Sequence, residues 1–251
     1  MSEIIFYDIP SKTQTNAWSP NTWNTRFTLN LKGLKYRTEW VEYPDIEASC
    51  KKIGAGQTST KSDGVTPHYT LPVIYDPSTK TVVADSFAIA EYLDTTYPNT
   101  PLVFPKNTRA LHAAYSDAFN DALMMPLYSL SVLPTALTLN PSSYEYFRRT
   151  REVSFGKKLE EVAPEDERGE EVWAKLEAGF AKIASWLEKN KEKPFVGGDK
   201  ITYADIEIAG RLIWAKIVMG EDSKGWQRIK AIDGGRWDRY LQQFDKYTTV
   251  V

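Results

Sequence analysis

Two short polar motifs stand where the sequence predicts the start of a helix. Ser19-Pro20 places a serine at the cap position and a proline at the first helical position, and Asp85-Ser86 places an acid and a hydroxyl before an apolar helical pattern. The first turn of a helix offers unpaired N–H groups and partial positive charge, so each motif could hold an anion. Serine and aspartate are also ordinary N-cap residues. From the residues alone simple capping is the favoured interpretation for Ser19, and for Asp85-Ser86 it is an alternative of equal weight.

Other residue types that carry chemistry are scarce. The 251 residues include one cysteine, Cys50, and two histidines, His68 and His112. A single cysteine excludes a disulfide framework, a CxxC redox pair and a cysteine-rich zinc site, and two histidines leave little for a metal centre or a Ser-His-Asp triad. We therefore expect no metal, and we expect Cys50 and His112 to be structural.

The overall composition narrows the class of protein. With 31 Lys and Arg against 33 Asp and Glu, the net charge is −2, which argues against a strongly basic nucleic-acid-binding protein. The arginine-rich segment 145–152 is flanked by acids and is expected to be a solvated face. No apolar run of about 18 residues predicts a membrane span, and the start of the chain does not resemble a signal peptide. We expect a cytoplasmic protein with neither nucleic acid nor membrane as a partner.

The first part of the chain mixes strand and helix signals. Pro72 lies in a strand-like stretch and, because proline has no N–H, it belongs at the first position or the edge of a strand. Together these signals predict a compact α/β domain over residues 1–98. A strand, a helix, a strand, a polar loop, a hairpin and a helix are expected in that order, over 4–7, 20–32, 36–43, 54–66, 71–84 and 85–97.

Strand signals fade after residues 99–106, a proline-bearing segment that we interpret as a linker. Residues 107–251 are therefore expected to form an all-helical domain. A helix is predicted over 107–125, and Pro126 and Pro134 are expected to break or bend the chain after it. Apolar residues at helical spacing over 172–187 predict another helix. The Thr202–Asp205 segment is typical of a capping box, and the helix after it is apolar on nearly all sides and should be buried.

These motifs together resemble the cytosolic glutathione transferases over essentially the whole chain. The resemblance rests on Ser19-Pro20, on Leu71-Pro72-Val73 before the hairpin and on Asp85-Ser86, with the capping box at Thr202. Segments 40–46 (WVEYPDI) and 84–93 (ADSFAIAEYL) are most similar to the β-etherase-related enzymes, and we place the chain with their fungal etherase-like (FuA) class. This implies an α/β thioredoxin-like N-terminal domain, an all-α C-terminal domain and glutathione as co-substrate.

For Ser19 the resemblance implies a role in stabilising the thiolate of glutathione. Lowering a thiol pKa of about 8.5 by about two units requires roughly 2.7 kcal/mol. A helix N-terminus supplies about 0.3–1 kcal/mol, up to ~2 when partly buried, and a hydrogen bond to a charged group about 1.5–3 kcal/mol. Asn21 and Thr22 are the alternative donors. Because position 19 is not cysteine, no mixed disulfide with glutathione can form there, so conjugation or thiolate attack is expected rather than thiol transfer.

The remaining anchors are expected to bind glutathione. Pro72 resembles the cis-proline of the family, which would let the Leu71 backbone pair with the cysteinyl backbone as an added strand does; an ordinary trans edge proline is the alternative. Asp85 and Ser86 would hold the γ-glutamyl end. Candidates for the glycyl carboxylate are taken from the 54–68 loop: Gln57, Lys61 and His68.

High aromatic content, with 8 Trp, 14 Tyr and 10 Phe, suggests a hydrophobic acceptor site. Most such residues pack in cores, so only a few are expected to touch a ligand. The candidates are Trp18, Trp23, Tyr115 and Phe119, with Tyr128 and Trp214 behind them. The resemblance implies a homodimer that attacks aromatic electrophiles or aryl ethers and binds polyphenolic ligands. A non-catalytic ligandin that sequesters such molecules, or a relative that has lost transferase chemistry, is the alternative.

Overall fold

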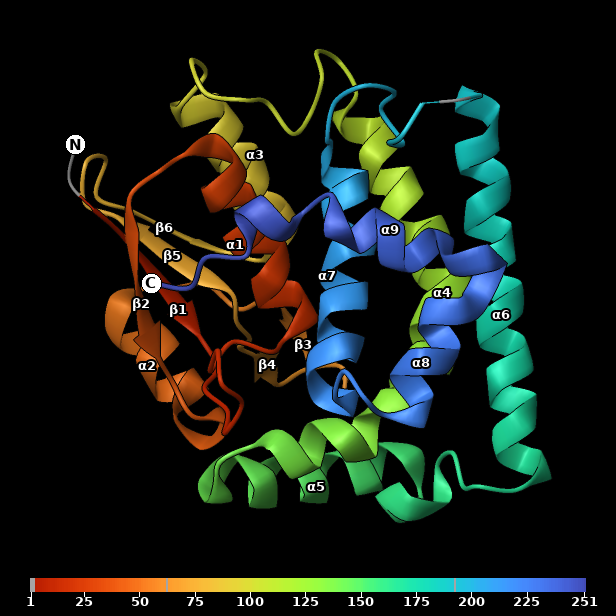
Figure 1. The fold of residues 1–251 in the computed structure, drawn as a ribbon. Coiled ribbons are helices and arrows are strands. Elements are labelled where there is room, and N and C mark those ends of the chain that lie inside the picture. The colour runs from red at the N-terminus through yellow and green to blue at the C-terminus, as the bar shows by residue number, and fades with distance from the viewer. Residues whose placement is uncertain (1–2, 62, 192) are drawn as a thin grey trace.

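Residues 3–61, 63–191 and 193–251 are described by a computed structural model. A mixed sheet with its helices forms the N-terminal part, and a group of long helices forms the C-terminal part (Figure 1). This arrangement confirms the expected thioredoxin-like domain followed by a helical domain. Residues 1–2 of the expected first domain and residue 62 of the expected loop lie outside the described residues.

Four strands in the order β2-β1-β5-β6 form the main sheet. β1 runs parallel to β2 and antiparallel to β5, and β5 and β6 form the expected hairpin. A parallel pair needs a crossover between its strands, and helix α1 supplies it. The bounds are β1 Ile4–Asp8, β2 Tyr36–Trp40, β5 Val73–Asp76 and β6 Thr81–Ala84.

The two helices whose starts could do chemistry begin where the sequence predicts. Helix α1 spans Pro20–Lys32 with Ser19 at its N-cap, and it ends at Gly33, whose φ of 65° suits a glycine. Helix α3 spans Ser86–Thr96. The Asp85 carboxylate accepts hydrogen bonds from the N–H groups of the second and third residues of α3, at 2.9 and 3.1 Å, and so caps this helix.

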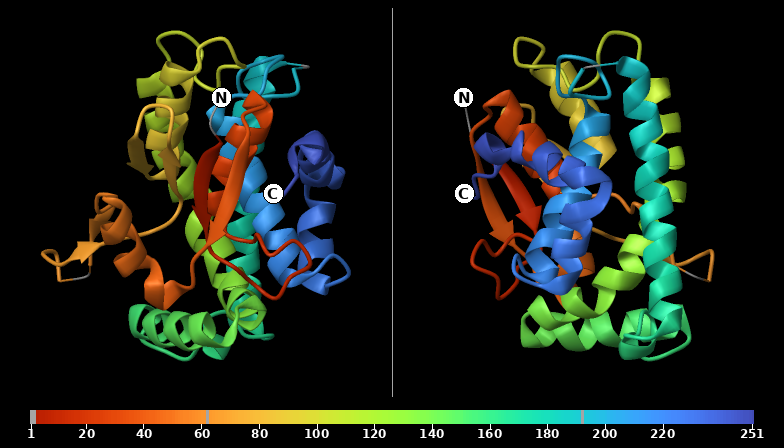
Figure 2. Two further views of the ribbon diagram at one scale, coloured as in Figure 1. Left: turned by 90° about the vertical axis from the view of Figure 1, so that its left-hand side faces the viewer. Right: turned by 45° about the vertical axis from the view of Figure 1, so that its right-hand side comes forward.

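Residues 41–68 differ from the prediction. Strand β2 ends at Trp40 rather than at residue 43, and a short 3-10 helix (Tyr43–Asp45) leads into helix α2, Ile46–Ile53, which the sequence reading missed. Pro44 cannot donate to a ladder, which favours leaving the sheet at this point. The expected loop contains two short strands, β3 (Ser59–Thr60) and β4 (Pro67–His68), on a segment that projects from the body of the molecule (Figure 2).

Helix α7 is the central element of the helical domain. It packs against α1 on one side and against α4 on the other (Figure 1). The Asp205 carboxylate accepts hydrogen bonds from the N–H and the hydroxyl of Thr202, both at 2.7 Å, so the expected capping contact at the start of this buried helix is confirmed. The helix bounds are α4 Arg109–Thr138, α5 Pro141–Phe155, α6 Glu167–Leu187, α7 Tyr203–Met219, α8 Lys224–Ala231 and α9 Arg236–Gln242.

Of the break or bend expected at two prolines, the break is wrong, because α4 runs through Pro126 and Pro134 for 30 residues. Since proline lacks an N–H, the Ala122 carbonyl loses the donor that residue 126 would provide. Helix α6 approaches α4 at this point, so closely that a Cβ on Gly179 would lie 2.3 Å from the Ala122 oxygen. Packing of α6 and α7 against α4 thus stabilises the helix although its two prolines disfavour it locally.

Replacing Gly179 with alanine is expected to lower the free energy of unfolding by about 2 kcal/mol. Overpacking against a backbone atom costs about 1–3 kcal/mol, and the gain of about 1 kcal/mol in helix propensity does not offset a contact this short. Gly56→Ala is the matched control, since its added Cβ meets no atom within 4 Å. Urea unfolding of both variants measures the effect. Equal midpoints for Gly179→Ala and the wild type would show that α4 and α6 separate easily here.

Candidate active site

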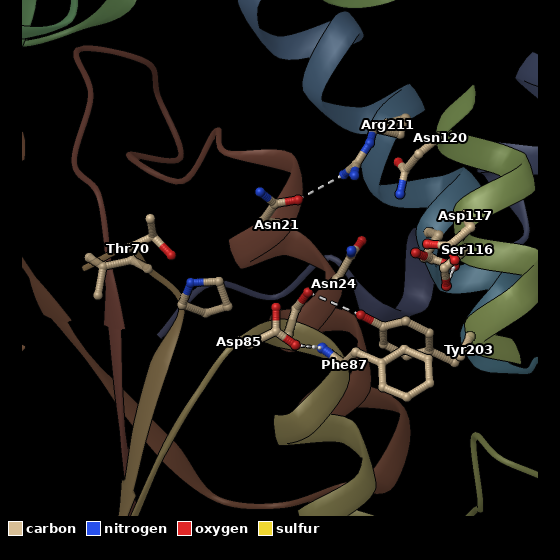
Figure 3. Close-up of a pocket in the computed structure, with 15 residues that line it drawn as sticks. Asn21, Asn24, Thr70, Asp85, Phe87, Ser116, Asp117, Asn120, Tyr203 and Arg211 are labelled. Atoms are coloured by element: carbon tan, nitrogen blue, oxygen red, sulfur yellow. Dashed lines mark hydrogen bonds between the residues drawn. The ribbon is translucent and has the colours of Figure 1, made fainter. Parts of the chain in front are cut away.

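Two adjoining cavities lie along the junction of the N-terminal and helical domains, and they share Asn21, Thr70 and Leu71. The first, about 320 Å³, is the polar cavity (Figure 3); its other main lining residues are Asn24, Pro72, Asp85, Ser86, Ser116, Asp117, Asn120, Tyr203, Glu207 and Arg211. The second, about 290 Å³, is the tyrosine cavity; its other main lining residues are Ser19, Tyr43, Lys61, His68, Tyr69, Tyr146 and Arg151.

The Leu71-Pro72 peptide bond is cis, as expected. Leu71 lines both cavities, and Pro72 lines the polar one. The Asp85 N–H donates to the Pro72 carbonyl at 3.2 Å, which fixes the start of α3 beside this strand edge. The fold therefore brings together the Leu71-Pro72-Val73 motif and the Asp85-Ser86 motif, which are 12 or more residues apart in sequence.

Asp85 and Ser86 both line the polar cavity, where α7 meets them. Ser86 is buried, and its hydroxyl accepts a hydrogen bond from the Tyr203 hydroxyl at 3.0 Å (Figure 3). Asp85 has a φ of 80°, an unusual backbone conformation that lets its side chain cap α3 at the cavity wall. An acid, a hydroxyl and a helix N-terminus thus face one polar space, which suits a ligand carrying both an ammonium and a carboxylate.

The sequence reading missed the charged residues that α7 contributes to the polar cavity. Glu207 accepts a hydrogen bond from the Ser116 hydroxyl at 2.7 Å, and Arg211 donates from Nη1 to Asn21 Oδ1 at 3.1 Å. The Arg211 Nε atom is buried and has no hydrogen-bond partner among the described residues. Glu207 and Arg211 lie four residues apart in the middle of a largely apolar helix, and this pair was the signal that could have revealed them.

Ser19 lines the tyrosine cavity, and its side chain makes no capping bond to α1. The simple capping interpretation is therefore wrong for its hydroxyl. Its carbonyl accepts the Trp23 N–H at 2.9 Å and the Thr22 hydroxyl at 3.0 Å. Since Thr22 is fully buried and its hydroxyl already donates, it is a poor candidate for a ligand contact.

Asn21 is exposed and lies at the boundary of the two cavities. Its amide oxygen is turned to Arg211, and its amide nitrogen points away from Arg211 (Figure 3). Arg211 therefore fixes the orientation of this amide and leaves two N–H donors directed elsewhere. Of the two alternatives to Ser19, only Asn21 lines the cavities.

The tyrosine cavity corrects the interpretation of residues 145–152 as a solvated face, because Tyr146 and Arg151 line it. Tyr43, from the short 3-10 helix, stacks on Tyr146 with ring centroids 5.8 Å apart. Burial raises the pKa of Tyr43 to about 12, and Arg151 opposes this rise. The Tyr43 phenol is therefore protonated at neutral pH and can donate a hydrogen bond.

Two of the three loop candidates for the glycyl carboxylate line the tyrosine cavity. Lys61 and His68 do so, whereas Gln57 lines neither cavity. Burial lowers the pKa of His68, and the neighbouring Arg151 and Lys61 charges lower it further. Lys61 pairs with Glu47, with 3.4 Å between Nζ and Oε2.

The aromatic candidates for an acceptor site lie elsewhere. Trp18, Trp23 and Phe119 are no more than 3% exposed, and Tyr115 stacks on Phe119 at 5.9 Å. None of these four lines either cavity, and the same holds for Tyr128 and Trp214. The helical ones lie on faces that pack into the core, and Trp18, which precedes α1, packs against Tyr43 with ring centroids 6.3 Å apart.

Glu207 is expected to make stability depend on pH. Burial raises its pKa from 4.5 to about 7, the Ser116 and Arg211 contacts oppose the rise, and Asp85 and Asp117 add to it. The folded protein then binds this proton more tightly than the unfolded chain. Its contribution is complete below about pH 4.5 and is lost as the pH rises through about 7, a change of roughly 3 kcal/mol.

Urea unfolding of the wild type and of Glu207→Gln, near pH 5 and near pH 8, isolates this contribution. Glutamine keeps the size of the side chain and removes the titration, so we expect it to gain stability relative to the wild type at the higher pH. A stability difference between the two proteins that is the same at both pH values would contradict the assignment.

Within residues 3–61, 63–191 and 193–251, no helix has both the length and the apolar character needed to cross a membrane. Across these same ranges, no group of three or more His, Cys, Asp or Glu side chains is arranged to hold a metal ion.

Comparison with known proteins gives two family matches that together cover most of the chain. Residues 18–96 match the glutathione S-transferase N-terminal domain, and residues 110–247 match the glutathione S-transferase C-terminal domain. The glutathione S-transferase-like protein ustS of Aspergillus flavus is 31% identical, with 94% of this chain and 87% of the relative covered.

Solved structures from fungi are similar over the whole length. A glutathione S-transferase of Ceriporiopsis subvermispora, in complex with glutathione, has a TM-score of 0.96 and 51% identity, covering 100% of this chain and 99% of that one. The glutathione transferase GSTFuA3 of Phanerochaete chrysosporium has a TM-score of 0.95 and 49% identity, with the same coverage.

Proposed function

Because this chain belongs to the glutathione S-transferase family, we propose that it activates the thiol of glutathione for attack on aromatic electrophiles or aryl ethers. Among its solved relatives are fungal enzymes of the FuA class. The observation that carries the proposal is the meeting of three motifs at adjoining cavities: Ser19 at the start of α1, the cis Leu71-Pro72 bond and the Asp85-Ser86 cap of α3.

In the proposed complex, the γ-glutamyl end of glutathione occupies the polar cavity. Its ammonium faces the carboxylates of Asp85 and Glu207, and its carboxylate faces Ser86 and the first turn of α3. Arg211, whose buried Nε has no partner within the described residues, is a second donor for the carboxylate. The cysteinyl backbone pairs with Leu71 at the strand edge.

The sulfur then lies at the boundary of the two cavities, where α1 begins. The N–H groups of the first turn and the Ser19 hydroxyl favour the thiolate, and the Asn21 amide is a second donor. The thiol proton leaves to solvent. The thiolate forms a bond to the electrophilic carbon, whose leaving group departs with the bonding electrons, and binding both reactants in one cleft provides the proximity.

A second candidate function is storage of aromatic ligands without turnover. It is favoured by a third cavity of about 1400 Å³, lined by Leu31, Leu102, Phe195 and Tyr247, among others, and not by Ser19. Such a space is larger than a single conjugation site requires. The implied homodimer and the cytoplasmic location remain predictions that sedimentation and cell fractionation would check.

Two assays on the wild-type protein separate these functions. One measures conjugation of glutathione to 1-chloro-2,4-dinitrobenzene, and the other measures displacement of a bound fluorescent probe by polyphenols. We expect conjugation that saturates with glutathione. Tight displacement with no conjugation above the uncatalysed rate would favour the storage function and overturn the proposal.

A further inference from the structure

Arg151 is a half-buried cation in the tyrosine cavity. Glu47, an acid that lines the same cavity, pairs with Lys51 and Lys61 instead. The Arg151 Nη1 atom donates to Thr150 Oγ1 at 3.1 Å, and none of the ion pairs formed by the described residues includes Arg151. By contrast Arg148, one turn earlier on α5, pairs with two glutamates at 2.7 and 2.9 Å. The Tyr43 and Tyr128 hydroxyls also interact with the Arg151 guanidinium, but neither is an anion. The charge of Arg151 therefore remains available to another group.

Contacts between the two domains hold Arg151 in place. Glu42 accepts a hydrogen bond from Asn140 Nδ2 at 2.7 Å and another from the Ser143 hydroxyl, and Ser143 Oγ accepts the Tyr43 N–H at 2.8 Å. A carboxylate at the N-terminus of α5 also suits the helix dipole. This docking fixes α5 against the chain after β2, and so places Arg151 over the cavity that contains Ser19.

The surroundings of Arg151 suit an aromatic ring as well as an anion. Its guanidinium lies 4.7 Å from the Phe147 ring centroid and 5.8 Å from that of Tyr43. Tyr43 and Tyr146 stack nearly parallel, with 12° between their planes, and line the same cavity. A neutral ligand would leave the cation without a counter-ion as water is displaced, whereas a carboxylate can accept two parallel hydrogen bonds from it.

We propose that the tyrosine cavity selects aromatic electrophiles that carry a carboxylate, with the carboxylate on Arg151 and the ring against Tyr43 and Tyr146; this inference rests on the proposed function. In the reaction with an aryl chloride, the thiolate sulfur bonds to the ring carbon that carries the chlorine. Chloride leaves with the electron pair of the broken bond. The carboxylate is unchanged and serves only in binding.

The test compares 4-chloro-3,5-dinitrobenzoate with its neutral methyl ester as acceptors. We expect Arg151→Gln to raise KM for the carboxylate by about 10- to 100-fold and to change KM for the ester by less than about threefold. Arg168→Gln is the matched control, since it removes the same charge from an exposed position that lines neither cavity. It should leave the preference for the carboxylate unchanged.

Two results would overturn the inference. One is an equal change of KM for the carboxylate and the ester. The other is a raised KM for glutathione with an unchanged acceptor preference, which would assign Arg151 to the glycyl carboxylate instead. Calorimetric binding of the two preformed thioether products needs no turnover. A wild-type protein that conjugates neither acceptor would therefore refute the proposed function. Product binding would still decide the role of Arg151: loss of the preference for the carboxylate product in Arg151→Gln supports it, and an unchanged preference contradicts it.

Discussion

Replacing Arg26 with leucine is expected to lower the free energy of unfolding by about 3–5 kcal/mol, because it leaves the buried Asp8 carboxylate without its cation. Both side chains are fully buried, and the Arg26 Nη2 atom lies 2.8 Å from Asp8 Oδ2. Arg26 also lies within 6 Å of four aromatic ring centroids, of which Phe6 at 4.9 Å is the nearest. Leucine fills part of this space but cannot pair with the charge.

The loss should also weaken function, because this ion pair ties α1 to β1 and so positions the start of α1. Urea unfolding followed by circular dichroism measures the stability. A second change, Asp8→Asn in the Arg26→Leu background, should restore part of the lost stability by removing the unpaired charge. Lys193→Leu, which breaks an exposed pair with Asp199, should have no measurable effect. If Arg26→Leu and the wild type unfold at the same urea midpoint, the buried pair does not hold α1 to the sheet.

Replacing Ser19 with alanine is expected to lower kcat/KM for conjugation by about 10- to 100-fold at neutral pH. The change removes one hydrogen bond to a charged sulfur, worth about 1.5–3 kcal/mol, and leaves the helix N-terminus in place. Because the Ser19 side chain makes no capping bond, the fold should be unaffected. The loss should shrink as the pH is raised toward the pKa of the free thiol, where the thiolate forms without help.

Asn21→Ala is the comparison that separates the two donors. The Asn21 amide nitrogen points away from Arg211, but the amide oxygen accepts from it, so Asn21→Ala removes a donor and also frees Arg211. The pKa of the bound thiol therefore has to be compared, and a larger rise of this pKa for Asn21→Ala than for Ser19→Ala would make the amide the main donor. A full conjugation rate in Ser19→Ala would show that the assignment of Ser19 is wrong.

Features with local causes could be predicted from the sequence. Ser19-Pro20 and Gly33 mark the ends of α1, Asp85 marks the start of α3, and Thr202 with Asp205 marks the start of α7. Asp85 and Asp205 accept from free N–H groups near a helix start, Pro20 has no N–H to satisfy, and Gly33 adopts the left-handed backbone that closes α1. The order of these elements was enough to predict an α/β domain followed by a helical one, and the resemblance to glutathione transferases implied that the first is thioredoxin-like.

Features with tertiary causes were missed. Pro126 should disrupt a helix, but α4 continues because α6 and α7 pack along it. Arg148 and Arg151 look alike in sequence, yet only the second faces the tyrosine cavity, because the contacts of Glu42 dock α5 in one orientation. Trp23 looked like a ligand contact and is in the core. No local pattern distinguishes these cases, since partners distant in sequence decide them.

The most direct measurement is the ultraviolet absorbance of the thiolate of bound glutathione as a function of pH, in the wild type and in Ser19→Ala. A sulfur held at the start of α1 should ionise about two units below the value of about 8.5 for a free thiol, and the variant should lose about half of that shift or more. A bound thiol that titrates like free glutathione in both proteins would contradict thiolate stabilisation at this helix start.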